Sequence, residues 1–202
     1  MGKTAKRTIL TLAALLPRWL VPPTVLHADD APKKSLPLSG EVFLVKGRTA
    51  FVIPPEAKPA IRPIPWVWYA PTLPNLPGDA EKWMFHRFTR AGIATAGIDV
   101  GESYGSPPGR ALYTAFYEVL TTSRDFAPKP VMLGRSRGGL MTLSWAVENA
   151  DKVAGFAGIF PVCNVASYPG VAKASGAYGL RAEELATRLA DHNPIDRLAA
   201  LA

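Results

Sequence analysis

The apolar positions of the chain gather in short segments, each with the length of one strand or one helix. Segments 41–45 and 49–54, EVFLV and TAFVIP, predict two strands joined by a turn at 46–48. The aromatic and β-branched run IPWVWYA at 64–70 predicts a strand that is buried on both faces. The first part of the chain is therefore expected to form a hairpin and one central strand.

After residue 78, segments with a helical period alternate with apolar strand-like runs. Asp79 is a candidate cap for the first helix and Gly92 is its expected stop. The predicted helices lie at 79–91, 112–120 and 140–147, and the predicted strands at 93–98, 131–133 and 153–162. This alternation predicts an α/β fold, a mostly parallel sheet with helices on both faces and the N-terminal hairpin as its antiparallel edge.

Residues 164–190 break this rhythm. The segment 164–179 is rich in small residues, and 181–190 has the pattern of one helix. We therefore expect a loop-and-helix excursion over the C-terminal edge of the sheet.

Residues 1–28 have the layout of a secretory signal, with Lys3, Lys6 and Arg7 before an apolar run at 9–16 and a small residue, Ala28, at the end. We expect export to the periplasm or the extracellular space. The apolar run is too short to span a bilayer, so no stable membrane span is expected once the signal is removed. The domain would then comprise residues 29–202.

Charge and cysteine content exclude two classes of protein. The signal-like segment holds four of the 23 Lys and Arg residues and no acidic residue, so residues 29–202 carry a net charge of only +3. No basic stripe interleaved with aromatic residues is found there, which argues against a nucleic-acid-binding protein. The single cysteine, Cys163, excludes an intrachain disulfide.

The candidate chemistry lies in the pentapeptide 134–138, Gly-Arg-Ser-Arg-Gly, which matches G-x-S-x-G. It follows a predicted strand and precedes a predicted helix, the context that a nucleophile elbow requires. Glycines at its ends tolerate close approach of neighbouring backbone, and the N–H of Arg137 would lie at a helix N-terminus, where it can stabilise an oxyanion. The alternative is that Ser136 only caps the helix.

Four segments resemble the α/β-hydrolases, in particular the exported bacterial esterase-like branch with prolyl-oligopeptidase-type catalytic domains. They are WVWYAPTLP at 66–74, AGIDVGESYGSP at 96–107, LGRSRGGL at 133–140 and HNPIDRL at 192–198. The resemblance implies that Ser136 is the nucleophile and that the N–H of Arg137 is one oxyanion donor. It places the second donor in the loop after the earlier strand, at Thr72 or Leu73.

A serine nucleophile needs a histidine to accept its proton and an acid to orient that histidine. Only His192 follows Ser136 in the order of the family, and it lies at a helix end, where a surface or capping role is expected. His86 precedes the elbow, and no acid follows a strand. In the family, two more strands come after the segment like HNPIDRL and carry the acid and the histidine. The resemblance thus implies an incomplete hydrolase domain whose last two strands are missing, with an exposed sheet edge through which the chain can self-associate.

Three further side chains are candidates for substrate binding. Glu102 and Tyr104 lie in the loop after strand 93–98, which should rise beside the elbow. Glu102 either faces substrate or holds the loop through backbone N–H groups. Arg135 is either a solvated turn residue or a group that attracts an anion.

Two hypotheses follow. The first is a serine hydrolase that cleaves a small-molecule carboxylic ester, or alternatively a peptide bond, through an acyl-enzyme on Ser136, without metal or organic cofactor. The second is a catalytically inactive hydrolase-like protein that binds a ligand or partner at the same cleft. A dinucleotide-binding protein is excluded, because no G-x-G-x-x-G follows the first parallel strand.

Overall fold

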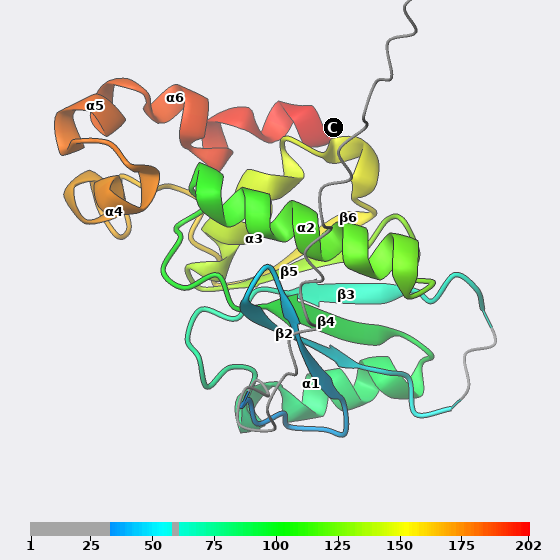
Figure 1. Ribbon diagram of the computed structural model, residues 1–202. Helices are drawn as coiled ribbons and strands as arrows, with labels where there is room; N and C mark the ends of the chain where they lie inside the picture. Colours follow the sequence, from blue (N-terminus) through cyan, green and yellow to red (C-terminus); the bar gives the residue numbers. More distant parts are fainter. Residues whose placement is uncertain (1–32, 58–60) are drawn as a thin grey trace, which may run out of the picture. The chain divides into compact units, whose positions relative to one another are not determined.

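The described part of the chain contains one mixed six-stranded sheet with the strand order β1-β2-β4-β3-β5-β6 (Figure 1). The computed structural model describes residues 33–57 and 61–202, so the predicted signal at 1–28 lies outside the described residues. The strands are β1 (Glu41–Val45), β2 (Arg48–Ile53), β3 (Trp66–Tyr69), β4 (Ala94–Ile98), β5 (Val131–Arg135) and β6 (Gly155–Ile159).

Strand directions confirm the predicted sheet. β1 and β2 form an antiparallel hairpin, and β2 is antiparallel to β4. β4, β3, β5 and β6 run parallel to one another. The carboxyl ends of the parallel strands therefore lie at one edge, where α/β proteins place their ligand sites.

Helices cover both faces of the sheet, as predicted. They are α1 (Asp79–Arg90), α2 (Pro107–Ser123), α3 (Gly138–Ala146), α4 (Val171–Tyr178), α5 (Ala182–Thr187) and α6 (Leu189–His192), with the 3-10 helices η2 (Ala150–Lys152) and η3 (Pro194–Leu201). Figure 1 shows α1 on one side of the sheet and α2 and α3 on the other.

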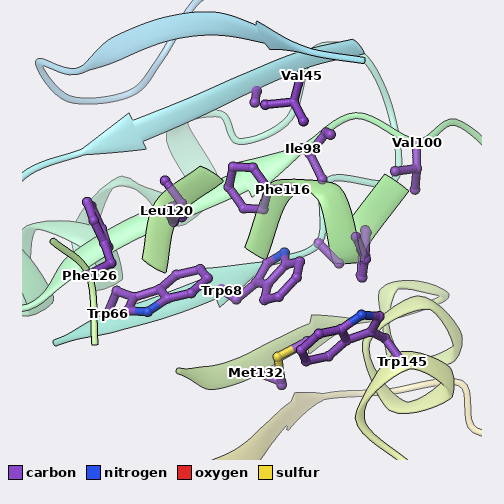
Figure 2. Packing of buried hydrophobic residues seen from close by; sticks show 14 of the residues in the cluster. Val45, Trp66, Trp68, Ile98, Val100, Phe116, Leu120, Phe126, Met132 and Trp145 are labelled. Atoms are coloured by element: carbon purple, nitrogen blue, oxygen red, sulfur yellow. The ribbon is translucent and has the colours of Figure 1, made fainter. Parts of the chain in front are cut away.

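Each face has its own apolar core. Phe85 of α1 packs with Val67, Tyr69 and Leu133 on one side. The larger core lies under α2 and α3 and is built around Trp68 (Figure 2). β3 contributes to both cores, and all four of its residues are buried, as the apolar run at 64–70 predicts.

The C-terminal excursion differs in detail from the prediction. The small-residue segment contains α4, which buries Ala174 and Tyr178 one turn apart. The single helix expected at 181–190 is wrong: Arg188, at φ −111° and ψ 15°, separates α5 from α6. This turn redirects the chain, so that His192 packs against the ring of Tyr178 at 5.1 Å. Long-range contact thus overrides local helix propensity.

The two edges of the sheet differ in their protection. β1 carries Glu41, which forms an ion pair with Arg124 at 2.7 Å. β6 pairs only with β5, no strand follows it within residues 61–202, and its sequence GFAGI contains neither a charge nor a proline. Such an edge lacks the usual features that discourage pairing with another chain.

Candidate active site

Ser136 lies on the turn between β5 and α3, with its side chain exposed to solvent. Its φ of +52° is in the left-handed region, which a residue with a Cβ adopts only under strain. The backbone on both sides is held: its N–H donates to the Ile159 carbonyl at 2.9 Å, and its own carbonyl accepts from Val162 at 2.8 Å. The hydroxyl makes no hydrogen bond within the described chain, and the N-cap of α3 is Arg137. Ser136 is therefore presented outward and does not cap α3.

Three glycines allow this turn to be so tight. A Cβ on Gly134 would lie 2.8 Å from the Cα of Gly139, and one on Gly139 would lie 2.6 Å from the Val162 carbonyl. A Cβ on Gly138 would lie 3.2 Å from the Ala70 carbonyl. The end of β3, the elbow and the segment after β6 therefore approach one another more closely than larger residues permit.

Two backbone donors lie beside the serine. The N–H groups of Arg137 and Thr72 donate no hydrogen bond to any described residue. The Thr72 methyl lies 3.5 Å from the position of a Cβ on Gly138, so this segment sits against the start of α3. The N–H of Leu73 is equally unpaired, and both residues remain candidates for the second oxyanion donor.

Glu102 and Tyr104 lie at the same edge. A Glu102 carboxylate oxygen lies 2.7 Å from Nη2 of Arg137, so the recorded partner of this acid is a side chain and not a loop N–H. Tyr104 is buried, at φ +49°. Burial and then the neighbouring Glu102 carboxylate raise the pKa of Tyr104 to about 12, so its phenol stays neutral at physiological pH.

Arg135 points away from this cluster, toward α1. Its guanidinium forms an ion pair with Glu81, which is buried and also accepts the N–H of Gly78 at 2.9 Å. The side chain thus ties the elbow to the start of α1. A role for Arg135 in substrate binding stays a prediction.

Sequence patterns did not identify Tyr168 as part of the site. Its hydroxyl accepts a hydrogen bond from Nη1 of Arg137 at 3.3 Å. It belongs to the predicted excursion, and no motif there distinguishes it from the neighbouring small and polar residues.

The described histidines do not contact the serine. His86 on α1 lies 3.1 Å from Glu56. His192 on α6 is not the expected surface residue: it is buried, and neither ring nitrogen has a hydrogen-bond partner in the described chain. Asp191 faces Arg188 at 3.8 Å. No described histidine or carboxylate is hydrogen-bonded to the Ser136 hydroxyl.

Two hollows lie near the candidate site, and Ser136 is not among the residues that line either one. One of about 140 Å³ lies beside Pro71, Thr72 and Leu73. The other, of about 350 Å³, includes Arg135 and Phe160 in its lining. Phe160 is 91% exposed and has a φ of +46°.

We expect the stability of the protein to fall as pH drops below about 6.5, the ordinary pKa of an unfolded histidine. Burial, followed by the positive charge of Arg188 and Arg110, lowers the pKa of His192 in the fold, and Asp191 opposes this only partly. The unfolded chain therefore binds the proton more readily, and the free energy of unfolding decreases from that pH downward until the folded pKa is passed. Urea unfolding at several pH values measures the slope.

The matched variants are His192→Phe and His86→Gln. The first should flatten the pH dependence below 6.5, because it removes the buried titrating group. The second removes a histidine whose side chain is 47% exposed, and it is the control for the loss of an imidazole in general. Equal slopes in the native protein and His192→Phe would contradict this assignment.

Within residues 33–57 and 61–202 there is no group of three His, Cys, Asp or Glu side chains arranged to hold a metal ion. The same residues include no helix that is both long and apolar enough to cross a bilayer.

Comparison with known proteins finds no matching family model and no matching curated protein. Solved structures do match. A puromycin-hydrolyzing peptidase of Mycobacterium tuberculosis is 17% identical with a TM-score of 0.60, over 81% of this chain and 30% of that one. The dipeptidyl peptidase 4 of Porphyromonas gingivalis is 14% identical with a TM-score of 0.59, over 81% of this chain and 26% of that one.

A shorter protein also matches. The S-formylglutathione hydrolase of Agrobacterium tumefaciens is 13% identical with a TM-score of 0.59, over 79% of this chain and 69% of that one. The chain thus spans less than a third of the two peptidases and about two thirds of this hydrolase. At these identities the similarity concerns the fold. Together with the strand order and the turn at Ser136, it shows that the described chain has the α/β-hydrolase fold.

Proposed function

We propose that the protein is a serine hydrolase that cleaves carboxylic esters through an acyl-enzyme on Ser136. The observation that carries the proposal is the strained φ of +52° at an exposed serine, placed between a parallel strand and a helix N-terminus with a free N–H. Strain at a single polar residue is a common feature of reactive sites. The peptidase and S-formylglutathione hydrolase activities named for the matching structures are also hydrolytic reactions at a carbonyl carbon, which agrees with this reaction class.

The proposed reaction has two halves. Oγ attacks the ester carbonyl carbon, its proton passes to a water molecule, and the carbonyl electrons form an oxyanion that the N–H groups of Arg137 and Thr72 receive. The alcohol then leaves with a proton, and water attacks the acyl group to release the acid and restore Ser136.

A fluorophosphonate probe tests the nucleophile directly. We expect covalent labelling of the intact protein and complete loss of labelling in Ser136→Ala. Ser123→Ala, which removes an exposed serine at the end of α2, should label like the unaltered protein. A folded but unlabelled protein, or equal labelling of Ser136→Ala, would exclude catalysis through this serine.

A second function has its own supporting observation. Because no described histidine or carboxylate contacts the Ser136 hydroxyl, the same cleft would serve a hydrolase-like protein that binds a ligand without cleaving it. Ligand binding that survives Ser136→Ala, with no turnover of any ester, would support this function. Ester hydrolysis that depends on Ser136 would refute it.

Two properties from the sequence accompany the proposal. The proposal of export rests on the signal-like sequence of residues 1–28, which lie outside the described part of the chain. The proposed self-association rests on the uncharged edge of β6, which no other described strand pairs and where a second copy could add a strand. Sedimentation over a range of protein concentrations would detect such association, and a single monomeric species throughout would rule it out.

A further inference from the structure

The side chain of Arg137 contacts three loops that surround Ser136. Its Nη2 lies 2.7 Å from Oε1 of Glu102, in the loop after β4, and 3.4 Å from the carbonyl oxygen of Thr72, in the loop after β3. Its Nη1 lies 3.3 Å from the hydroxyl of Tyr168, in the segment after β6. The side chain is only 21% exposed. One guanidinium therefore connects the ends of three parallel strands to the residue that follows the serine.

The carboxylate of Glu102 orients this guanidinium. The two charged groups lie 2.7 Å apart, the distance of a close ion pair, and the planar guanidinium has donors in fixed directions. The attraction of Glu102 limits how this planar group can turn, and in the observed orientation Nη2 donates to the Thr72 carbonyl at 3.4 Å. Ion pairing here sets geometry more than it adds stability, since Glu102 is 42% exposed.

The arrangement is not the most stable one for an arginine. The Nε–H of Arg137 is enclosed without a hydrogen-bond partner in the described chain. An enclosed donor left unpaired is destabilising, because it has lost its hydrogen bond to water. A solvated side chain would avoid that cost, which favours a functional reason for the contact with Thr72.

The contact with Thr72 acts on a peptide beside the candidate oxyanion donors. A hydrogen bond to the Thr72 carbonyl restrains rotation of the peptide that joins Thr72 and Leu73, and with it the direction of the backbone on both sides. The same segment lies against Gly138 at the start of α3. No backbone hydrogen bond from the N–H of Thr72 or Leu73 holds it within the described chain.

We propose that the Arg137 side chain is a positioning residue, which holds the peptide between Thr72 and Leu73 against the elbow so that an N–H group of this segment and the N–H of Arg137 face one oxyanion. This role rests on the proposed function, and it goes beyond the backbone role of Arg137, because it assigns the guanidinium a separate task.

Two measurements on the intact protein test it. ¹⁵N relaxation gives the backbone order parameters of Thr72 and Leu73, which we expect to fall from a rigid value of about 0.85 to below about 0.6 in Arg137→Gln. Fluorophosphonate labelling of Ser136 should slow by about 10- to 100-fold, the effect of misplacing a group near the reacting atoms. Arg137→Lys should recover part of both values, because an ammonium can donate to Thr72 or to Glu102. Arg124→Gln, which breaks a distant ion pair with Glu41, should change neither.

The double variant Arg137→Glu with Glu102→Arg separates positioning from simple charge pairing. It restores an ion pair, but a carboxylate at 137 cannot donate to the Thr72 carbonyl. We expect the loop to stay mobile and labelling to stay slow. Recovery of both to the unaltered values would overturn the proposal, as would unchanged order parameters and labelling in Arg137→Gln.

The two readouts also keep this inference distinct from the proposed function. If Arg137→Gln mobilises Thr72 but even the unaltered protein is not labelled, Arg137 holds the loop and the hydrolase proposal fails. If the unaltered protein is labelled and Arg137→Gln is labelled at the same rate, the hydrolase proposal stands and the positioning role fails.

Discussion

Replacing Trp68 with alanine is expected to lower the free energy of unfolding by about 3–5 kcal/mol. The side chain is fully buried at the centre of the larger core (Figure 2). Its ring lies 4.9 Å from Trp145, 5.0 Å from Tyr113, and 5.3 Å from both Trp66 and Phe116, measured between centroids. These partners come from three different elements, β3, α2 and α3. They therefore cannot move together to fill the cavity that the substitution leaves. The variant loses both the buried area and the packing around it.

Urea unfolding followed by circular dichroism measures the loss. Trp83→Ala is the matched control, because Trp83 is 75% exposed and its removal should change stability by no more than about 0.5 kcal/mol. Trp68→Phe should fall between the two, since it keeps an aromatic ring and removes an indole N–H that has no partner in the described chain. Similar losses for Trp68→Ala and Trp83→Ala would mean that the core is not built around Trp68.

The contrast between these tryptophans marks how far the sequence predicts the fold. Trp68 lies in an unbroken apolar run, and such runs have few alternatives to a central strand. The pattern also predicts the parallel order, because each crossover carries a helix with one apolar face. The excursion was less predictable: α4 contains few large apolar residues, and its burial of Tyr178 depends on a hydrogen bond to the carbonyl of Tyr104, which is 74 residues away.

The same division applies to the candidate site. The turn at Ser136 is local, so a glycine pattern five residues long is sufficient to predict it. The partners of the Arg137 side chain lie 31 and 65 residues away for Tyr168 and Thr72, and no spacing rule connects them. The burial of His192 was missed for the same reason, since α6 packs against Tyr178 of another helix.

Gly139→Ala is expected to lower the free energy of unfolding by about 2–4 kcal/mol, from overpacking and from one disturbed hydrogen bond. The new methyl would lie 2.6 Å from the Val162 carbonyl and 2.8 Å from Cβ of Pro161. Backbone on that side has to move, and the N–H of Val162 is the group that donates to the Ser136 carbonyl. The strain at Ser136 is therefore expected to relax, and fluorophosphonate labelling should slow together with the loss of stability.

Gly176→Ala is the control. Gly176 lies within helix α4, where alanine has the higher helix propensity, and an added methyl there would meet no neighbouring atom within 4 Å. It should raise stability by about 0.5–1 kcal/mol and leave labelling unchanged. The difference in stability between the two variants separates the effect of the close packing at Gly139 from the effect of helix propensity. If Gly139→Ala were as stable as Gly176→Ala, the segment after β6 would have room to move away from α3, and its contact with the Ser136 carbonyl could not be what keeps the serine at a positive φ.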